Sequence, residues 1–291
     1  MMLTDLCGME TALSEMRSRL RRVSGKHNPE VRKLRSAYAQ GGLTEEGYCA
    51  IEGVHLVEEA IRSGVRFQMV FFSEAAEARI ERLLPQLSSR IETLLLPEKL
   101  FDGAVPSETP QGVAALVKLK KHSLEDVIGK SAPALVLAIA GVQDPGNLGT
   151  LIRSAEAFGA GGVALGENTV SAFNPKTVRA TAGSVFRLPI TSGKLTETLA
   201  VFRTRGLRMV ATSSHRGAPL ADTDLRGPIA IVIGGEGAGV PKSLMPQVDQ
   251  VVAIPHSPQV ESLNAGVAGS IVLYEAARQR AVDPVKIGPQ E

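Results

Sequence analysis

Residues 229–241 read Ile-Ala-Ile-Val-Ile-Gly-Gly-Glu-Gly-Ala-Gly-Val-Pro, five apolar residues that pass directly into a glycine-rich loop. Two other stretches likewise contain or follow an apolar strand pattern and lead through Gly, Pro or Asn into a helix pattern. Residues 144–159 read Asp-Pro-Gly-Asn-Leu-Gly-Thr-Leu-Ile-Arg-Ser-Ala-Glu-Ala-Phe-Gly, and residues 251–264 read Val-Val-Ala-Ile-Pro-His-Ser-Pro-Gln-Val-Glu-Ser-Leu-Asn. Uninterrupted apolar strands are typical of a parallel sheet covered on both faces. Ligands bind such sheets at the carboxyl ends of the strands, so the three loops predict one shared site.

The rest of the chain alternates between strand and helix patterns and predicts an α/β protein. Apolar runs predict strands at 47–52, 66–73, 91–96, 113–119, 134–141, 161–165, 207–212, 229–234 and 250–254. Helices are expected at 4–22, 29–39, 54–62, 74–87, 148–158, 174–182, 194–205 and 261–280. We therefore expect a basic helical extension (1–23), a small N-terminal α/β domain (24–119), a polar linker (120–132), a domain with a mostly parallel sheet flanked by helices (133–283) and a tail (284–291).

Composition narrows the class of protein. The 291 residues are 44% hydrophobic and 21% charged, with a net charge of +2, as in ordinary globular proteins. The two cysteines, Cys7 and Cys49, form no metal-ligand pattern, and we expect free thiols and no metal. No apolar run is long enough for a membrane span and no signal peptide is evident, so a cytoplasmic location is expected. Residues 17–36 hold eight Lys or Arg and one acid, which indicates either phosphate contacts or a solvated face.

The glycine-rich loop matches neither of two familiar phosphate-binding motifs. A P-loop needs Lys and Ser or Thr directly after its last glycine, but Val240-Pro241 intervenes here. A dinucleotide fingerprint counted from Gly235 would need glycine where Val240 stands. A backbone that can approach a ligand closely and a tight structural turn both remain open, with a helix expected to begin at Pro241.

Polar residues in the other two loops are candidates for chemistry. Asn147 and Arg153 lie across a helix entry, and a surface pair between Arg153 and Glu156 is the simpler explanation of the arginine. Glu261 and Ser262 are expected to cap the last helix, which would place Asn264 in its first turn. His256 fits a structural role better than acid–base chemistry. The small residues Ala265, Gly266, Ala268 and Gly269 permit close helix packing, within the domain or between subunits.

Together, the order and spacing of the three stretches resemble the three motifs of the SpoU (TrmH-like) RNA ribose 2′-O-methyltransferases of the SPOUT class. Residues about 132–281 are similar to the catalytic domain of that family. Residues about 24–118 are similar to its substrate-binding domain, through Asn28-Pro-Glu-Val31, Glu52-Gly-Val-His-Leu-Val-Glu-Glu-Ala60 and Thr109-Pro-Gln-Gly112. The resemblance implies S-adenosylmethionine as cofactor, RNA as substrate, a deep trefoil knot in the C-terminal chain and a homodimer formed through that domain.

The resemblance also implies roles for individual residues. Cofactor contacts would come from Gly234, Ile254 and Leu263, within a pocket framed by Thr212, Gly235 and Gly237. Catalytic roles would fall to Asn147, Arg153, Glu236, Ser262 and Asn264, with Arg153 activating the ribose hydroxyl. A free guanidinium keeps its proton at ordinary pH. Two roles of Arg153 therefore stay open: a base neutralised by the site, or a charged group that lowers the hydroxyl's pKa and holds a phosphate.

This chain departs from the usual third motif, since His256 replaces Met, Pro258 replaces Gly, and Gly266 stands where Ser is common. The predicted function is methyl transfer from S-adenosylmethionine to a ribose 2′-hydroxyl, with ribosomal RNA favoured over tRNA because the N-terminal domain accompanies ribosomal RNA members more often. The alternatives are tRNA as substrate, or a catalytically silent RNA-binding or assembly factor. Arg153, Asn147, Glu236 and Asn264 together argue against a silent relative, and the broken fingerprint argues against a dehydrogenase.

Overall fold

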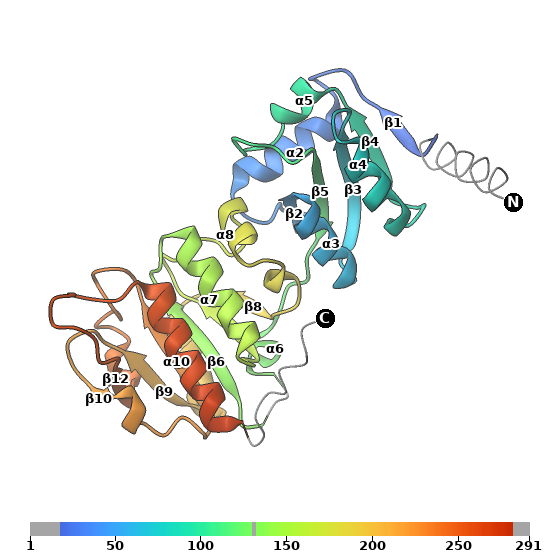
Figure 1. Cartoon of the computed structure of the whole chain (residues 1–291). Coiled ribbons are helices and arrows are strands. Elements are labelled where there is room, and N and C mark those ends of the chain that lie inside the picture. Colours follow the sequence, from blue (N-terminus) through green and yellow to red (C-terminus); the bar gives the residue numbers. More distant parts are fainter. Residues whose placement is uncertain (1–17, 130–131, 282–291) are drawn as a thin grey trace, which may run out of the picture. The chain divides into compact units, whose positions relative to one another are not determined.

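The strands and helices gather into two compact units (Figure 1). The computed structural model describes residues 18–129 and 132–281. The N-terminal unit comprises the residues up to Lys120 together with Phe173–Phe186, and the C-terminal unit comprises Lys121–Ala172 together with the residues from Arg187 onward. The segment 173–186 thus packs with the N-terminal unit, although it lies inside the 133–283 domain proposed from sequence.

The N-terminal unit is a five-stranded sheet with the order β1-β4-β3-β5-β2, in which β5 runs antiparallel to both neighbours. The strands are β1 (Leu20–Arg22), β2 (Tyr48–Glu52), β3 (Arg66–Ser73), β4 (Glu92–Leu96) and β5 (Val113–Lys118). The helices are α2 (Pro29–Gln40), α3 (Val54–Arg62), α4 (Glu77–Leu83), α5 (Glu98–Asp102) and α8 (Pro175–Ala180), with 3-10 turns η1 (Leu84–Gln86) and η2 (Ser184–Phe186). One core cluster joins this sheet to α2 and α5 through residues such as Leu34, Phe71, Leu94 and Phe101.

Helix α2 begins and ends as the sequence predicts. Asn28 caps it by accepting a 2.9 Å hydrogen bond from the amide of Glu30, and Pro29 fills the first position, where no N–H is needed. Gly41 ends the helix in the left-handed conformation, with φ +58°. In β2, Cys49 is a free thiol buried completely, and this burial raises its pKa to about 12.

The expected helix over 4–22 is wrong at its end, because Leu20–Arg22 is strand β1, paired in parallel with β4. Arg21 is held there by Glu92 and Glu30, with nitrogen–oxygen distances of 2.5 and 2.9 Å. Arg19 donates to the carbonyl of Leu87 at 3.1 Å. Pairing with a free sheet edge and these ion pairs outweigh local helix propensity. Residues 4–17, and with them Cys7, lie outside the described residues.

The C-terminal unit is a seven-stranded sheet with the order β10-β12-β9-β11-β6-β7-β8, and every neighbouring pair is parallel. The strands are β6 (Leu135–Ala140), β7 (Gly162–Leu165), β8 (Ile190–Ser192), β9 (Arg208–Thr212), β10 (Ala218–Pro219), β11 (Ile229–Gly234) and β12 (Gln250–Ala253). The helices are α6 (Leu124–Ile128), α7 (Pro145–Ala157), α9 (Leu195–Thr204) and α10 (Ala265–Arg280), with 3-10 turns η3 (Leu220–Asp222) and η4 (Met245–Gln247). Every residue of the central strands β6 and β11 is buried, which confirms the predicted α/β class with a parallel sheet flanked by helices.

Two local expectations are wrong. The polar segment 120–132 contains helix α6, whose Ser123 and Asp126 form a capping box and whose Val127 is buried in the core. No helix begins at Pro241, since the chain turns there and forms only the short η4. Pro246 explains this, because it has no N–H for the hydrogen bond that an α-helix starting at Pro241 would require.

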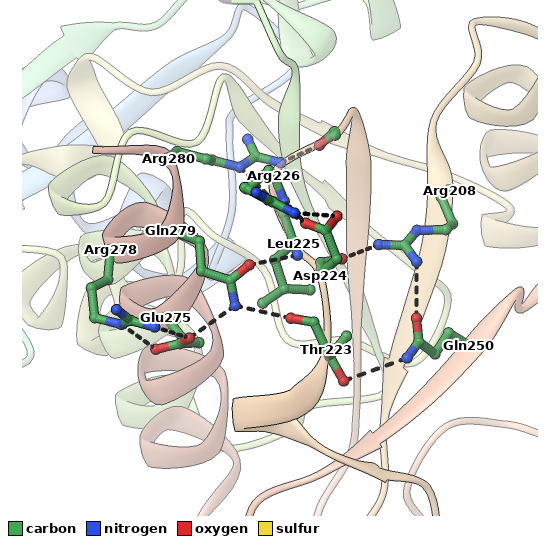
Figure 2. A network of polar contacts seen from close by, with 11 residues as sticks. Arg208, Thr223, Asp224, Leu225, Arg226, Gln250, Glu275, Arg278, Gln279 and Arg280 are labelled. Atoms are coloured by element: carbon green, nitrogen blue, oxygen red, sulfur yellow. Dashed lines mark hydrogen bonds and ion pairs between the residues drawn. The ribbon is translucent and has the colours of Figure 1, made fainter. Parts of the chain in front are cut away.

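Polar contacts hold the end of α10 against the loop 223–227 (Figure 2). Arg280 donates to the carbonyls of Leu225 at 2.8 Å, Gly227 at 2.5 Å and Pro133 at 3.2 Å. Gln279 accepts from the amide of Leu225 and donates to the carbonyl of Thr223. These bonds fix the C-terminal end of the helix whose other end enters the candidate site.

Candidate active site

A cavity of about 520 Å³ lies at the carboxyl ends of β9, β11 and β12. Four loops or loop ends enclose it, because parallel strands bring all their carboxyl ends to one edge. Nine of the eleven predicted site residues line it: Thr212, Gly234, Gly235, Glu236, Gly237, Ile254, Ser262, Leu263 and Asn264. Asn147 and Arg153 do not line it. The volume falls within the range of small-molecule sites.

The glycine-rich loop doubles back on itself at the floor of this cavity. Gly239 donates its amide to the carbonyl of Gly235 at 3.0 Å, and the two residues form a bridge. A Cβ at Gly234 would lie 1.9 Å from the Gly239 carbonyl carbon, and one at Gly235 would lie 2.3 Å from the oxygen of Gly141. The loop is therefore a tight turn, and its backbone also lines the cavity.

A chain of side-chain hydrogen bonds links one residue from each of the three loops. Asn264 Nδ2 donates to Asn147 Oδ1 at 2.8 Å, and Asn147 Nδ2 donates to Glu236 Oε1 at 2.6 Å. The amide directions are fixed at one end, because Asn264 Oδ1 accepts the backbone amide of Val267 at 3.1 Å. Nδ2 of Asn264 must then face Asn147, whose own Nδ2 is left for the carboxylate. Asn147 does not line the cavity itself, but it is hydrogen-bonded to Glu236 and Asn264, which do.

Close packing of α10 on α7 brings these partners together. A Cβ added at Gly269 would lie 2.2 Å from Leu151 Cδ2, and one at Gly266 would lie 3.3 Å from Thr150 Cβ. These two small residues therefore serve packing within the unit. Asn264 is the N-cap of α10 rather than a residue of its first turn, so the expectation that Glu261 and Ser262 cap the helix is wrong. The Asn264 side-chain oxygen satisfies an otherwise unpaired amide at this helix start.

Arg153 is the predicted site residue that the structure does not bring to the cavity. It lies exposed on α7 and forms no ion pair within the described ranges 18–129 and 132–281. The simpler explanation from sequence, a pair with Glu156, does not apply. Glu156 instead accepts two hydrogen bonds from Arg187, at 2.6 and 2.9 Å. Arg153 is thus an exposed, unpaired cation on the solvent side of the helix that carries Asn147.

Several charged or polar cavity residues were not singled out from sequence. His215 and Arg216 enter from the loop after β9, and Glu261 enters from the loop before α10. For His215 and Arg216, the position just after the end of β9 was the available signal. His256 also lines the cavity, but its Nδ1 lies 2.7 Å from the carbonyl oxygen of Ile254. A carbonyl can only accept, so Nδ1 carries the proton, and this bond supports the structural role favoured from sequence.

The described residues contain no group of three or more His, Cys, Asp or Glu side chains that could hold a metal ion. None of the helices described here combines the length and apolar character required to cross a membrane.

Comparison with known proteins gives a consistent result. Residues 134–274 match the sequence model of the SpoU rRNA Methylase family, and residues 50–123 match that for RNA 2′-O ribose methyltransferase substrate binding. The chain is 33% identical over 256 residues to the 23S rRNA (guanosine(2553)-2′-O)-methyltransferase RlmP of Bacillus subtilis, covering 88% of this chain and 98% of that one.

Solved structures agree. An AdoMet-bound rRNA methyltransferase from Sinorhizobium meliloti superposes with a TM-score of 0.78 at 29% identity, over 89% of this chain and 98% of that one. The SpoU methyltransferase AviRb from Streptomyces viridochromogenes, in complex with AdoMet, gives 0.76 at 26% identity, over 87% and 98%. Both neighbours carry the same cofactor on the same fold.

Proposed function

The chain belongs to the SpoU rRNA methylase family, and from that premise we propose that it transfers a methyl group from S-adenosylmethionine to a ribose 2′-hydroxyl of ribosomal RNA. The observation that carries the proposal is the Asn264–Asn147–Glu236 hydrogen-bond chain at the edge of the 520 Å³ cavity. Ribosomal RNA is favoured over tRNA because RlmP, a relative along nearly its whole length, is named for a ribosomal RNA substrate.

The cavity residues fit S-adenosylmethionine. The cavity volume of about 520 Å³ suits one cofactor-sized molecule. Ile233, Ile254 and Leu263 offer apolar surface for an adenine ring, and the glycine loop exposes backbone groups close by. The lining also contains both signs of charge, with Arg216 for a carboxylate and Glu236 or Glu261 for cationic groups. When bound, this cofactor supplies an electrophilic methyl group, so the protein has mainly to align a ribose oxygen and manage its proton.

The residues of this chain would divide that work. Positioning alone can supply about 7–11 kcal/mol of rate enhancement, and the Asn264–Asn147–Glu236 chain is a rigid frame for it. Glu236 has a second carboxylate oxygen with which to accept a hydrogen bond from the nucleotide. Ser262 lines the cavity beside Asn264 and adds a hydroxyl. These roles fit a site that holds the hydroxyl in one orientation.

We assign Arg153 the charged role. It lies exposed and has no ion-pair partner among the described residues, so its guanidinium is available to an anion of the substrate. A planar cation of this kind suits a backbone phosphate or a developing ribose oxyanion. The proton of the ribose 2′-hydroxyl then passes to another group or to water.

We also propose a homodimer formed through the C-terminal unit. Val267 and Tyr274 on α10 are 47% and 54% exposed, and Phe158 packs edge-on against Tyr274 with ring centroids 5.7 Å apart. Large exposed apolar side chains on one helix are typical of a protein interface. Arg153 projects from the exposed side of α7, so in a dimer it can border the partner's cavity.

Two further features follow from family membership as proposals. One is the deep trefoil knot of the C-terminal chain, which family membership implies. The other is a cytoplasmic location, where ribosomal RNA is made and modified. Incubation with tritiated S-adenosylmethionine and total RNA from cells lacking the protein tests the function. Label in ribosomal RNA supports it, and tight cofactor binding without transfer would favour the silent assembly factor.

A further inference from the structure

A second cavity lies in the N-terminal unit, at the edge of the sheet where β2, β3 and β4 begin. It has a volume of about 510 Å³ and is lined by Tyr48, Val65, Arg66, Phe67, Gln68, Arg90 and Ile91. Tyr48 and Arg66 are the first residues of β2 and β3, and Arg90 lies in the turn two residues before β4. Lys118, the last residue of the antiparallel β5, is paired with both Tyr48 and Arg66. Strand direction therefore gathers three cations at one edge.

The charge of this cavity is positive and not neutralised by the unit itself. No acidic side chain lines it. Arg66 and Arg90 are exposed and have no ion-pair partner within the described parts of the chain. Some other arginines of the same unit are paired, as Arg82 is with Glu58 at 2.6 Å. Two guanidinium groups without an anion, beside a space of this size, suit a phosphate diester.

Two aromatic rings supply a second kind of contact. Tyr48 and Phe67 are half-buried in the lining, and the Lys118 ammonium lies 4.9 Å from the centroid of the Tyr48 ring. Aromatic faces beside cations are the means by which proteins hold unpaired bases without reading their sequence. The basic segment 17–36 is a weaker candidate for this contact, because Arg21 and Arg35 are already bonded to other groups of the unit.

We propose that this cavity binds one nucleotide of a single-stranded segment of the RNA substrate, with its phosphate between Arg66 and Arg90 and its base against Tyr48. The proposal rests on the proposed function for the identity of the RNA. The proposal goes beyond that function by assigning the RNA contact to the edge of the sheet at which β2, β3 and β4 begin. The volume of about 510 Å³ is sufficient for a nucleotide.

Binding of a fluorescein-labelled single-stranded 12-mer RNA to the full-length protein, followed by anisotropy over a range of salt concentrations, tests the proposal. Arg66→Gln/Arg90→Gln is expected to weaken binding at least about tenfold at low salt and to reduce the log–log salt slope by about 0.7, since the two arginines share one phosphate and each single-strand phosphate contact contributes about 0.7. Arg82→Gln/Arg226→Gln removes the same charge from two ion-paired arginines and is expected to bind as wild type.

Tyr48 separates stacking from charge. Tyr48→Ala is expected to weaken binding about 5- to 150-fold with an unchanged salt slope, whereas Tyr48→Phe keeps the ring and retains binding. Melting temperatures of all variants show whether each is folded, and a folded Arg66/Arg90 variant with wild-type affinity and slope would overturn the proposal. Displacement of the RNA by polyglutamate as readily as by unlabelled RNA would instead assign the cavity to an acidic protein segment.

The two proposals can fail separately. In the methyl-transfer assay, the Arg66/Arg90 variant is expected to raise KM for RNA at least about tenfold at low salt with kcat unchanged, and to bind S-adenosylmethionine as wild type. A wild-type protein that transfers no methyl group, but whose RNA binding still depends on these arginines, would remove the proposed function and keep this site. Methyl transfer that is equally efficient in wild type and in the Arg66/Arg90 variant would keep the proposed function and remove this site.

Discussion

Asn147 and Glu236 are 89 residues apart in the sequence, yet the side-chain amide of Asn147 donates a 2.6 Å hydrogen bond to the Glu236 carboxylate. The bond joins the first turn of α7 to the loop after β11, and the bond from Asn264 adds the residue that caps α10. Three segments that look unrelated in the sequence thus form one frame beside the cavity.

Removing the centre of that frame should impair chemistry more than cofactor binding. Asn147→Ala is expected to lower kcat by about 10²-fold, because it removes the group that orients Glu236, while the Kd for S-adenosylmethionine changes little. Stopped radiolabel assays and calorimetric titration measure the two quantities. In a double-mutant cycle, Asn147→Ala and Glu236→Ala should be less than additive, and strictly additive losses would show that the two residues act independently.

Arg153 should be essential without supporting the fold. Arg153→Ala is expected to lower kcat by at least about 10²-fold with an unchanged melting temperature, since the residue is exposed and unpaired. Arg153→Lys should restore little, because a lysine cannot form the paired hydrogen bonds of a guanidinium. Full activity of the alanine variant on ribosomal RNA would remove Arg153 from the mechanism. Alanine at Arg203, which is ion-paired with Asp249, is the control.

Gly234 should tolerate no side chain. Gly234→Ala would place a Cβ 1.9 Å from the carbonyl carbon of Gly239, so the loop must shift. We expect this shift to lower the free energy of unfolding by about 1–3 kcal/mol and to weaken cofactor binding. Thermal unfolding with and without S-adenosylmethionine measures both effects. Gly193→Ala is the matched control, since a Cβ there meets nothing within 4 Å. Equal behaviour of the two variants would contradict the described loop geometry.

Acid should weaken the anchor of α10. Hydrogen bonds from Arg278 lower the pKa of Glu275 from its ordinary 4.5 to about 2. The carboxyl therefore holds fewer protons when folded than when unfolded, and its stabilising effect is present above pH 4.5 and lost as the pH falls toward 2. Urea unfolding of wild type should show this loss. The difference in free energy of unfolding between wild type and Glu275→Gln should shrink as the pH falls from 4.5 toward 2. Glu98→Gln, an equal change of charge at an exposed residue of α5, is the control for the change in net charge.

Much of the architecture is predictable because its signals are local. The apolar runs that form β6 and β11 predict a buried parallel sheet, and the glycine and asparagine residues after them predict loops at its carboxyl edge. Asn28 and Gly41 likewise act through bonds to their own neighbours, so both ends of α2 are foreseeable. The three motifs bring together most of the cavity lining for the same reason, since each directly follows or precedes a regular element.

What could not be predicted depends on partners distant in the sequence. Leu20–Arg22 is a strand because β4 offers a free edge, and the bond from Asn264 to Asn147 depends on α10 packing against α7 through Gly269. The association of 173–186 with the N-terminal unit has no local signal either. Arg66 and Arg90 carry no motif, and their significance emerges only when strand order places them beside Tyr48.

The most direct test of the central claim is the position of the methyl group itself. Ribosomal RNA from a deletion strain, from a strain restored with wild type and from one restored with Arg153→Ala would be mapped for 2′-O-methylated riboses by mass spectrometry. One methylated ribose absent from the deletion strain, regained with wild type and still absent with Arg153→Ala is the predicted result. Identical ribose methylation of ribosomal RNA in all three strains would contradict the proposed function.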